Sequence, residues 1–128
     1  MTLGCNDWRK LARLAWLVAM CGVLVLSLLP GKHLPPQVLD IWDKAQHAFG
    51  FVVLTVLGVL SYPSRAARTA AGLLVLGVLI EVAQSMTGWR YGEVADWVAD
   101  VVGVAIGLPL GLYTNAVLTR WCRPALQR

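Results

Sequence analysis

The sequence predicts an all-α protein, a four-helix transmembrane bundle with both termini cytoplasmic. Apolar residues make up 58% of the 128 residues and charged residues only 14%, which differs from ordinary soluble domains. The apolar residues are grouped in four runs, and a helix needs about 20 such residues to cross a bilayer. We therefore expect one domain over residues 1–128, with spans at about 11–29, 43–62, 66–86 and 94–119.

The first span, residues 11–29, follows basic residues that resemble the start of a signal peptide. It is longer than the apolar part of a typical signal peptide and no A-x-A cleavage pattern follows it, so we expect an uncleaved helix. Arg13 lies inside the run and can extend its charged head to the interface. Residues 32–42 contain two adjacent prolines, which cannot continue a helix, and are predicted to form a short external loop.

The second and third spans are separated by a short basic turn. The second span, residues 43–62, ends before Pro63, and the segment SYPSRAAR turns the chain into the third. The segment TGWRYGE forms a second external loop before the fourth span. Pro109 lies inside that fourth span, where we expect a kink.

The positions of the charged residues predict the orientation. Eight of the 11 Lys and Arg residues fall at the end that holds both termini. They are Arg9, Lys10, Arg13, Arg65, Arg68, Arg120, Arg123 and Arg128, and the others are Lys32, Lys44 and Arg90. Because basic residues accumulate on the cytoplasmic side, both termini are expected there. Six of the seven acidic residues lie toward the outer end. Tryptophans are expected as belts at both interfaces, Trp8 and Trp121 inside and Trp42, Trp89 and Trp97 outside.

The fourth span carries a glycine at every fourth position, Gly103, Gly107 and Gly111, and Ala99 extends the row. Such a row lets a neighbouring backbone approach closely. We expect it to pack against another span of the same chain rather than to form a dimer interface, because small-residue rows are common within bundles. The oligomeric state stays open.

Three of the four spans carry a pair of polar residues on one helix face, near the outer membrane surface. The members of each pair are three or four residues apart, a spacing that places them side by side on a helix. Ionisable residues at membrane depth are costly, and they usually face inward and serve a function. With two basic residues nearby as counter-ions, we predict one ligand-binding pocket open to the outside. The predicted residues are Asp43, Lys44, His47, Glu81, Gln84, Arg90, Asp96 and Asp100.

A structural role is the alternative for these residues. Asp43 and Asp96 lie in the first turns of helices, where exposed amides favour a carboxylate, so capping and function are both open for them. His47 and Glu81 lie about one turn inside the apolar runs, where contact with lipid is unfavourable for both. For these two we favour a functional site or a buried polar network.

The ordered polar residues resemble those of the VanZ-like family, small bacterial membrane proteins named for an accessory protein of teicoplanin resistance. The resemblance rests on DKAQHAFGF in the second span, EVAQ in the third, a following WR, and ADWVAD before a G-x-x-x-G. It covers most of the chain. It implies a bacterial inner membrane location and a link to the cell envelope and the antibiotic response, but it supplies no biochemical activity.

Asp100 departs from the family pattern, which usually has an amide at this position. A carboxylate there must be protonated or paired, and the sequence offers Lys44 or Arg90 as partners. This difference leaves any amide-specific role of the position in doubt.

The favoured function is binding of an envelope component, such as a lipid-linked precursor headgroup or a glycopeptide, by the acidic and polar pocket. The alternative is an enzyme acting on an envelope lipid headgroup. In it, Glu81 or Asp96 is the general base and His47 the acid or an orienting group. Whether a reaction is catalysed stays open, because no Ser or Cys nucleophile lies among these residues.

A divalent metal held by His47 and the carboxylates is a variant of the enzyme hypothesis, but no H-x-x-x-H motif is present and no cofactor is assigned. A transporter or channel is disfavoured because the inner halves of the spans are almost purely apolar. Nucleic-acid binding is excluded because the basic residues lie at span ends rather than in a stripe. The three cysteines show no metal-ligand spacing and imply no disulfide framework.

Overall fold

The structure, a computed structural model, describes residues 5–30 and 36–122. Within these residues it contains four long helices and one short 3₁₀ helix. Their bounds are α1 Cys5–Leu28, α2 Pro36–Ser61, η1 Pro63–Arg65, α3 Ala66–Met86 and α4 Val94–Cys122. Each of the four long helices is long and apolar enough to cross a membrane. The fold is therefore all-α with four candidate spans, which indicates a multi-pass membrane protein.

The predicted boundaries agree best with the structure in the second half of the chain. The third span coincides with α3, and the fourth begins at Val94 as predicted but continues past residue 119. α1 begins at Cys5, before the predicted start at residue 11. The prediction covered only the apolar run, but the polar residues before it are helical as well. There Nζ of Lys10 lies 3.5 Å from Oδ1 of Asp7, an ion pair at the i,i+3 spacing of a helix.

The prediction that residues 32–42 form a loop is wrong from residue 36 onward. α2 begins at Pro36 and includes the segment that was expected to be an external loop. At the start of a helix the missing N–H of proline would be unpaired in any case, and its fixed φ suits the helix. The proline therefore starts a helix here. Lys32, Arg123 and Arg128, which entered the topology prediction, lie outside the described residues.

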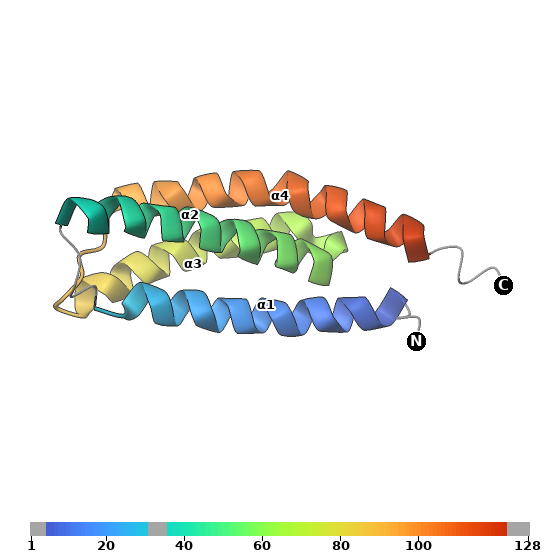
Figure 1. The fold of residues 1–128 in the computed structure, drawn as a ribbon, viewed down its shortest axis with the longest axis horizontal. Coiled ribbons are helices and arrows are strands. Elements are labelled where there is room, and N and C mark those ends of the chain that lie inside the picture. The colour runs from blue at the N-terminus through green and yellow to red at the C-terminus, as the bar shows by residue number, and fades with distance from the viewer. Residues whose placement is uncertain (1–4, 31–35, 123–128) are drawn as a thin grey trace.

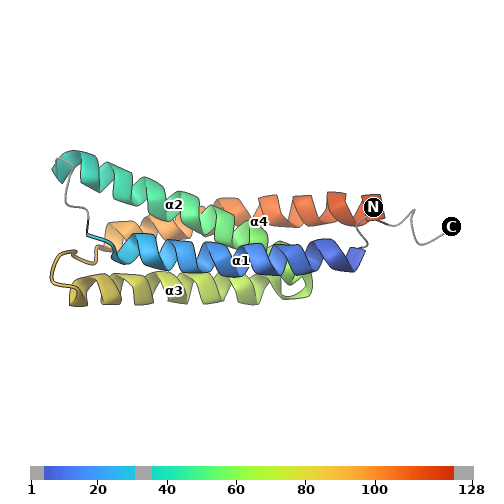
Figure 2. The same ribbon diagram turned by 60° about the horizontal axis from the view of Figure 1, so that its bottom comes forward.

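α2 and α4 form the central helix pair. They lie side by side along much of their length and make the most extensive interhelical contact in the described part of the chain (Figure 1). α1 packs mainly against α2, and α3 mainly against α4. All four long helices run roughly along one direction (Figure 2). The core between the helices contains Phe51, Leu54, Leu73, Ile80 and Val104. The end of α1, the start of α2 and the loop between α3 and α4 lie at one end of the bundle, opposite η1.

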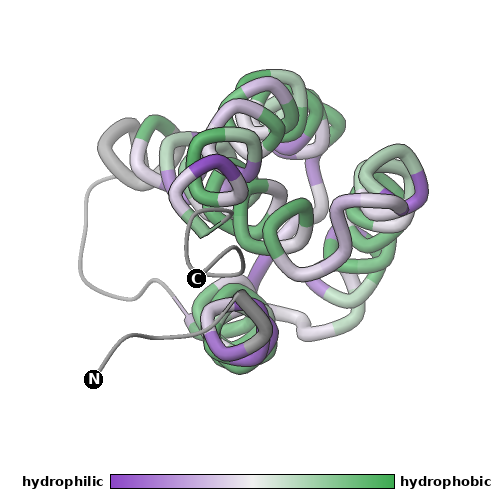
Figure 3. The backbone as a smooth tube through the Cα atoms, turned by 90° about the vertical axis from the view of Figure 1, so that its right-hand side faces the viewer, coloured by the Kyte–Doolittle hydropathy of each residue, from purple (hydrophilic) through white to green (hydrophobic). Residues whose placement is uncertain are grey.

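Much of the outer surface is apolar. Large hydrophobic side chains such as Leu14, Val18 and Met86 are exposed, at 61%, 65% and 82% of their surface. Figure 3, which looks along the bundle, shows hydrophobic residues in all four helices and hydrophilic residues in short stretches. Soluble monomers rarely expose large apolar patches, whereas helices in contact with lipid do so normally. The surface therefore agrees with the four candidate spans.

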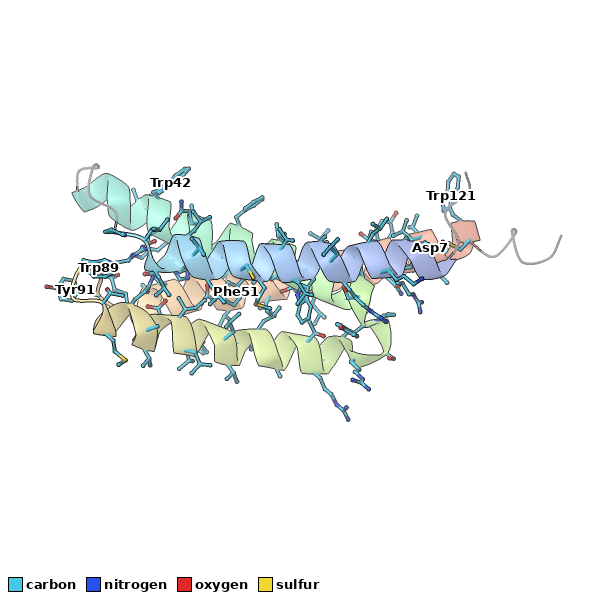
Figure 4. The ribbon with its side chains drawn as sticks, turned by 90° about the horizontal axis from the view of Figure 1, so that it is seen from below. Asp7, Trp42, Phe51, Trp89, Tyr91 and Trp121 are labelled. Carbon is cyan, nitrogen blue, oxygen red and sulfur yellow. The ribbon has the colours of Figure 1, made fainter. Side chains whose placement is uncertain are left out.

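Aromatic residues mark both ends of the bundle. Trp42, Trp89 and Tyr91 lie at the end that holds the α3–α4 loop, and Trp121 lies at the other end (Figure 4). This distribution matches the expected aromatic belts. Trp97, which was also expected in the outer belt, is partly buried, and its Nε1 donates a hydrogen bond to a carbonyl oxygen of α3 at 3.2 Å.

The glycine row of α4 packs against α2, as predicted. A Cβ at Gly103 would collide with a backbone carbonyl oxygen of α2, and one at Gly107 would lie 2.7 Å from the Cβ of Thr55. A Cβ at Gly111 would lie 2.9 Å from the Cβ of Val59. The missing side chains let the two backbones approach closely. This contact, which we call the glycine seam, fixes α4 against α2 directly beside the candidate site.

Candidate functional site

The loop between α3 and α4 positions polar residues at one end of the bundle. Gly88 has a φ of 76°, the left-handed conformation that commonly reverses the chain after a helix. The Gly92 N–H donates to Oγ of Ser85 at 3.2 Å, and the Glu93 N–H donates to Oε2 of Glu81 at 2.7 Å. The loop is thus tied back to α3. The carboxylate of Glu81 consequently lies at the start of α4, where the helix dipole favours a negative charge.

Three side chains from this region cap the C-terminal end of α1. Nε2 of Gln84 and Nη1 of Arg90 both donate to the carbonyl oxygen of Ser27, at 2.9 and 2.7 Å. Nε1 of Trp89 donates to the carbonyl oxygen of Leu28 at 3.1 Å. The last carbonyls of a helix have no partner within it, and leaving them unpaired in an apolar environment is costly. Capping α1 is therefore a sufficient structural reason for these three donors.

Ion pairs form the outer layer of the site. Besides capping α1, Arg90 binds Asp43 of α2 through Nη2 and Oδ1. Nζ of Lys44 lies 3.2 Å from Oε2 of Glu93 and 3.6 Å from Oδ1 of Asp96. These pairs link α2 to α4 and to the loop before it. Only 2% of Asp96 is exposed, so the charged layer continues into the interior of the bundle.

His47 is the centre of the inner layer. Its Nδ1 lies 2.9 Å from Oδ1 of Asp100 and 3.9 Å from Oε1 of Glu81, so one imidazole joins α2 to carboxyl groups of α3 and α4. His47 is 4% exposed and Asp100 is fully buried. Gly77 of α3 leaves room for the Asp100 carboxylate, because a Cβ at Gly77 would lie 2.5 Å from its Oδ2.

We call these side chains together the polar cluster. It consists of Asp43, Lys44, His47, Glu81, Arg90, Glu93, Asp96 and Asp100. Its five carboxyl groups outnumber its two permanently charged cations and one histidine. Four buried atoms of the polar cluster have no hydrogen-bond partner among the described residues: Nε2 of His47, Oε1 of Glu81, Oδ1 of Asp96 and Oδ2 of Asp100. Because buried polar groups are normally paired, these atoms point to further binding capacity.

The structure brings together seven of the eight predicted site residues, all except Gln84, which faces α1 instead. Asp100 is paired with His47, whereas its expected partners Lys44 and Arg90 bind carboxyl groups nearer the loop. Glu93 belongs to the cluster and was not predicted. Its spacing of three residues from Asp96 was a signal that both lie on one side of the α4 start. A ligand role for the cluster stays a prediction.

An apolar groove of about 650 Å³ runs between α1 and α2 and reaches the polar cluster. Asp43 and His47 line one part of it, and Gly50 and Val53 line it farther along α2, with Gly22 of α1 also in its wall. A smaller groove of about 280 Å³ lies on the α3–α4 side of the cluster. The cluster is therefore open to apolar surfaces that would face lipid in a membrane.

Two sets of side chains in the cluster have donor atoms close enough to hold a metal ion. One set is His47, Glu81 and Asp100, and the other is Asp43, His47 and Asp96. Within each set, one donor atom from every residue lies within 4.8 Å of the others. Imidazole nitrogen combined with carboxylate oxygen is a donor set typical of zinc and other first-row divalent ions.

Comparisons of the chain with protein-family models, with curated proteins and with solved structures give no match. The resemblance to the VanZ-like family therefore rests on the quoted residues alone. A helical bundle by itself hosts many unrelated activities, so the chemistry of the site, and not the fold, indicates the function.

Proposed function

We propose that this protein is a VanZ-like protein of the bacterial inner membrane that binds a membrane lipid or a lipid-linked envelope precursor. One observation carries the proposal: the apolar groove between α1 and α2 leads directly to the buried polar cluster at Asp43 and His47. An amphiphile has the same division into an apolar chain and a polar headgroup. The chain of the ligand lies along the groove, and its headgroup meets the polar cluster.

The charges of the polar cluster favour a headgroup that carries both a phosphate and an amine. Lys44 and Arg90 supply positive charge for a phosphate, although both are already engaged with carboxylates. The excess of carboxyl groups supplies sites for an amine, and an acceptor atom such as Oε1 of Glu81 has no hydrogen-bond partner. Such a mixed site discriminates against lipids that are purely anionic, because like charges brought together are unfavourable.

The distribution of basic residues supports an orientation with both termini in the cytoplasm. In the described part of the chain, η1, the start of α3 and the end of α4 lie at the end opposite the polar cluster (Figure 1). These segments carry Arg65, Arg68 and Arg120. By the positive-inside rule that end is cytoplasmic. The polar cluster then lies at the outer leaflet, where precursors of the cell envelope are used.

An enzyme acting on an envelope lipid headgroup is the second candidate, and the pairing of His47 with Asp100 favours it. A buried carboxylate 2.9 Å from Nδ1 orients the imidazole and leaves Nε2, which has no hydrogen-bond partner, as the nitrogen that accepts a proton. Among the described residues no serine or cysteine side chain forms a hydrogen bond with His47, so the nucleophile is water or a second substrate. Glu81 and Asp96 are the alternative bases.

Filling the groove tests the binding proposal. A Cβ at Gly22 would have nothing within 4 Å, so Gly22→Leu places its side chain into the groove without a backbone clash. We expect delipidated wild-type protein to bind phosphatidylethanolamine in native mass spectrometry and to bind phosphatidylglycerol more weakly. Gly22→Leu is expected to lose most of the phosphatidylethanolamine bound. A polyprenyl phosphate-linked amine added as competitor distinguishes a lipid-linked precursor from a bulk lipid.

Gly72→Leu is the matched control. Gly72 is exposed on α3, a Cβ there also has nothing within 4 Å, and it is not part of the α1–α2 groove. This variant should bind phosphatidylethanolamine like the wild type. Equal binding by Gly22→Leu and the wild type, or no preference for the amine-bearing lipid, would show that the groove and cluster do not act as proposed.

A further inference from the structure

The inner layer of the polar cluster has the geometry of a metal site. His47, Glu81 and Asp100 come from three different helices, and their donor atoms lie within 4.8 Å of one another. Two donors bound to one ion at about 2.1 Å lie about 3.0 to 3.4 Å apart in octahedral or tetrahedral geometry. The separations of Nδ1 of His47 from Asp100 and Glu81, 2.9 and 3.9 Å, lie on either side of this range. Side-chain shifts that close the wider separations would bring all three donor atoms onto one ion.

The unpartnered atoms of this set point to a ligand. Oε1 of Glu81 and Oδ2 of Asp100 are buried and have no hydrogen-bond partner among the described residues. Asp100 has none of its surface exposed, so water at the surface does not solvate its carboxylate. Two carboxyl groups beside one imidazole in an apolar bundle are costly unless they are neutralised. A divalent cation neutralises them in one step.

The charges around the second set make it the weaker candidate. Asp43 is bound by Arg90, and Asp96 lies 3.6 Å from Nζ of Lys44, so a cation there would compete with two charges already present. The ion partner that the structure gives both Glu81 and Asp100 is His47, a residue that can be a neutral metal ligand. The inner set is therefore preferred.

We propose that His47, Glu81 and Asp100 hold one divalent transition-metal ion of the zinc class. One imidazole and two carboxylates favour such an ion over magnesium or calcium, which take oxygen ligands. Three protein ligands leave at least one position open for water or for an oxygen of a bound headgroup. The proposal does not depend on lipid binding, because the set of ligands is complete without the groove.

The test measures metal binding directly. Protein without a histidine tag, with Cys5, Cys21 and Cys122 replaced by serine so that thiols do not contribute, is stripped of metal and loaded with Zn²⁺ in detergent. We expect one Zn²⁺ per chain after gel filtration and a higher melting temperature with the metal. Co²⁺ in place of Zn²⁺ gives a visible absorption spectrum that reports the donor set.

Variants separate the two sets of ligands. Glu81→Gln and Asp100→Asn are expected to lower Zn²⁺ affinity by more than about 100-fold, since loss of outer-shell partners alone costs about 10- to 100-fold. Asp43→Asn, which belongs to the second set only, should keep the wild-type affinity. Monodispersity and melting temperature show whether each variant is folded. If Asp100→Asn does not fold, the Zn²⁺ affinity of Glu81→Gln tests the proposal.

Three results would overturn the proposal. They are no stoichiometric Zn²⁺ in the wild type, wild-type affinity in folded Glu81→Gln, and a loss in Asp43→Asn as large as in Asp100→Asn. The last result would assign the ion to the second set.

Discussion

The contact between α2 and α4 is built in two different ways along its length. In the half nearer η1 it is the glycine seam, where Gly107 lets the backbones approach. The buried hydroxyls of Thr55 and Ser61 in this half of α2 donate to carbonyl oxygens of their own helix, at 2.6 and 2.7 Å. In the half nearer the α3–α4 loop, His47 meets Asp100, and buried atoms of both residues have no hydrogen-bond partner. These two hydroxyls of α2 are thus paired within their helix, whereas several buried atoms of the polar cluster have no hydrogen-bond partner.

This difference indicates which half stabilises the bundle. Close packing of glycine against a neighbouring helix is a known source of stability in membrane helices, whereas hydrogen bonds between membrane helices contribute only about 0.6 kcal/mol on average. Carboxyl groups gathered in one place also repel each other. We infer that the glycine seam carries the stability and that the polar cluster is kept for a ligand.

The largest effect is expected from breaking the glycine seam. In Gly107→Leu the new side chain meets Thr55 and the backbone of Val52, both within 3.2 Å of the Cβ position, so the helices must separate. Unfolding free energy in detergent should fall by about 1 to 3 kcal/mol, as for other overpacked sites. Thermal unfolding of the monomer measures it. Gly72→Leu, which adds the same side chain where there is open space, should leave stability unchanged.

A different result would change the interpretation of the seam. If Gly107→Leu folds as well as the wild type and only fails to dimerise, the glycine row serves an interface between chains and not the contact with α2.

A smaller effect on stability is expected from neutralising the polar cluster. Glu81→Gln and Asp96→Asn keep the shape of each side chain and remove one negative charge, so the melting temperature should stay the same or rise as repulsion is relieved. An envelope phenotype such as glycopeptide susceptibility, scored in cells without the wild-type copy, should be lost. If stability falls together with the phenotype, the polar cluster is a structural network rather than a binding site.

The orientation of the protein in the membrane has no effect on its stability. It decides which half of the α2–α4 contact faces the outside of the cell. A reporter enzyme that works only in the cytoplasm should be active when it is fused after Arg128, because the basic residues concentrate at that end. A cysteine in the α3–α4 loop, for example at Tyr91, which is 87% exposed, should react with an impermeant thiol reagent in intact cells. A C-terminus found outside would contradict this orientation and the outer-leaflet site with it.

Four helices, with the polar residues near one end of the apolar runs, could be predicted from the sequence alone, because a bilayer demands about 20 apolar residues per span and strongly restricts charge within it. The glycine row predicted close packing for the same kind of reason, since only a missing side chain allows it. The start of α2 was not predicted correctly. The same residue can start or end a helix, so α2 began at Pro36 and not after the predicted loop.

Which polar groups meet could not be predicted from the sequence, because it depends on the packing of the helices. Gln84 and Asp100 both lie on polar helix faces at similar depth, yet Gln84 caps α1 through Ser27 and Asp100 pairs with His47. Spacing along one helix places side chains on a face, but a partner on another helix depends on how the helices are rotated and how closely they approach. In this bundle the glycine seam and the small residue at Gly77 set that approach, and they bring three ligand-type side chains from three helices together.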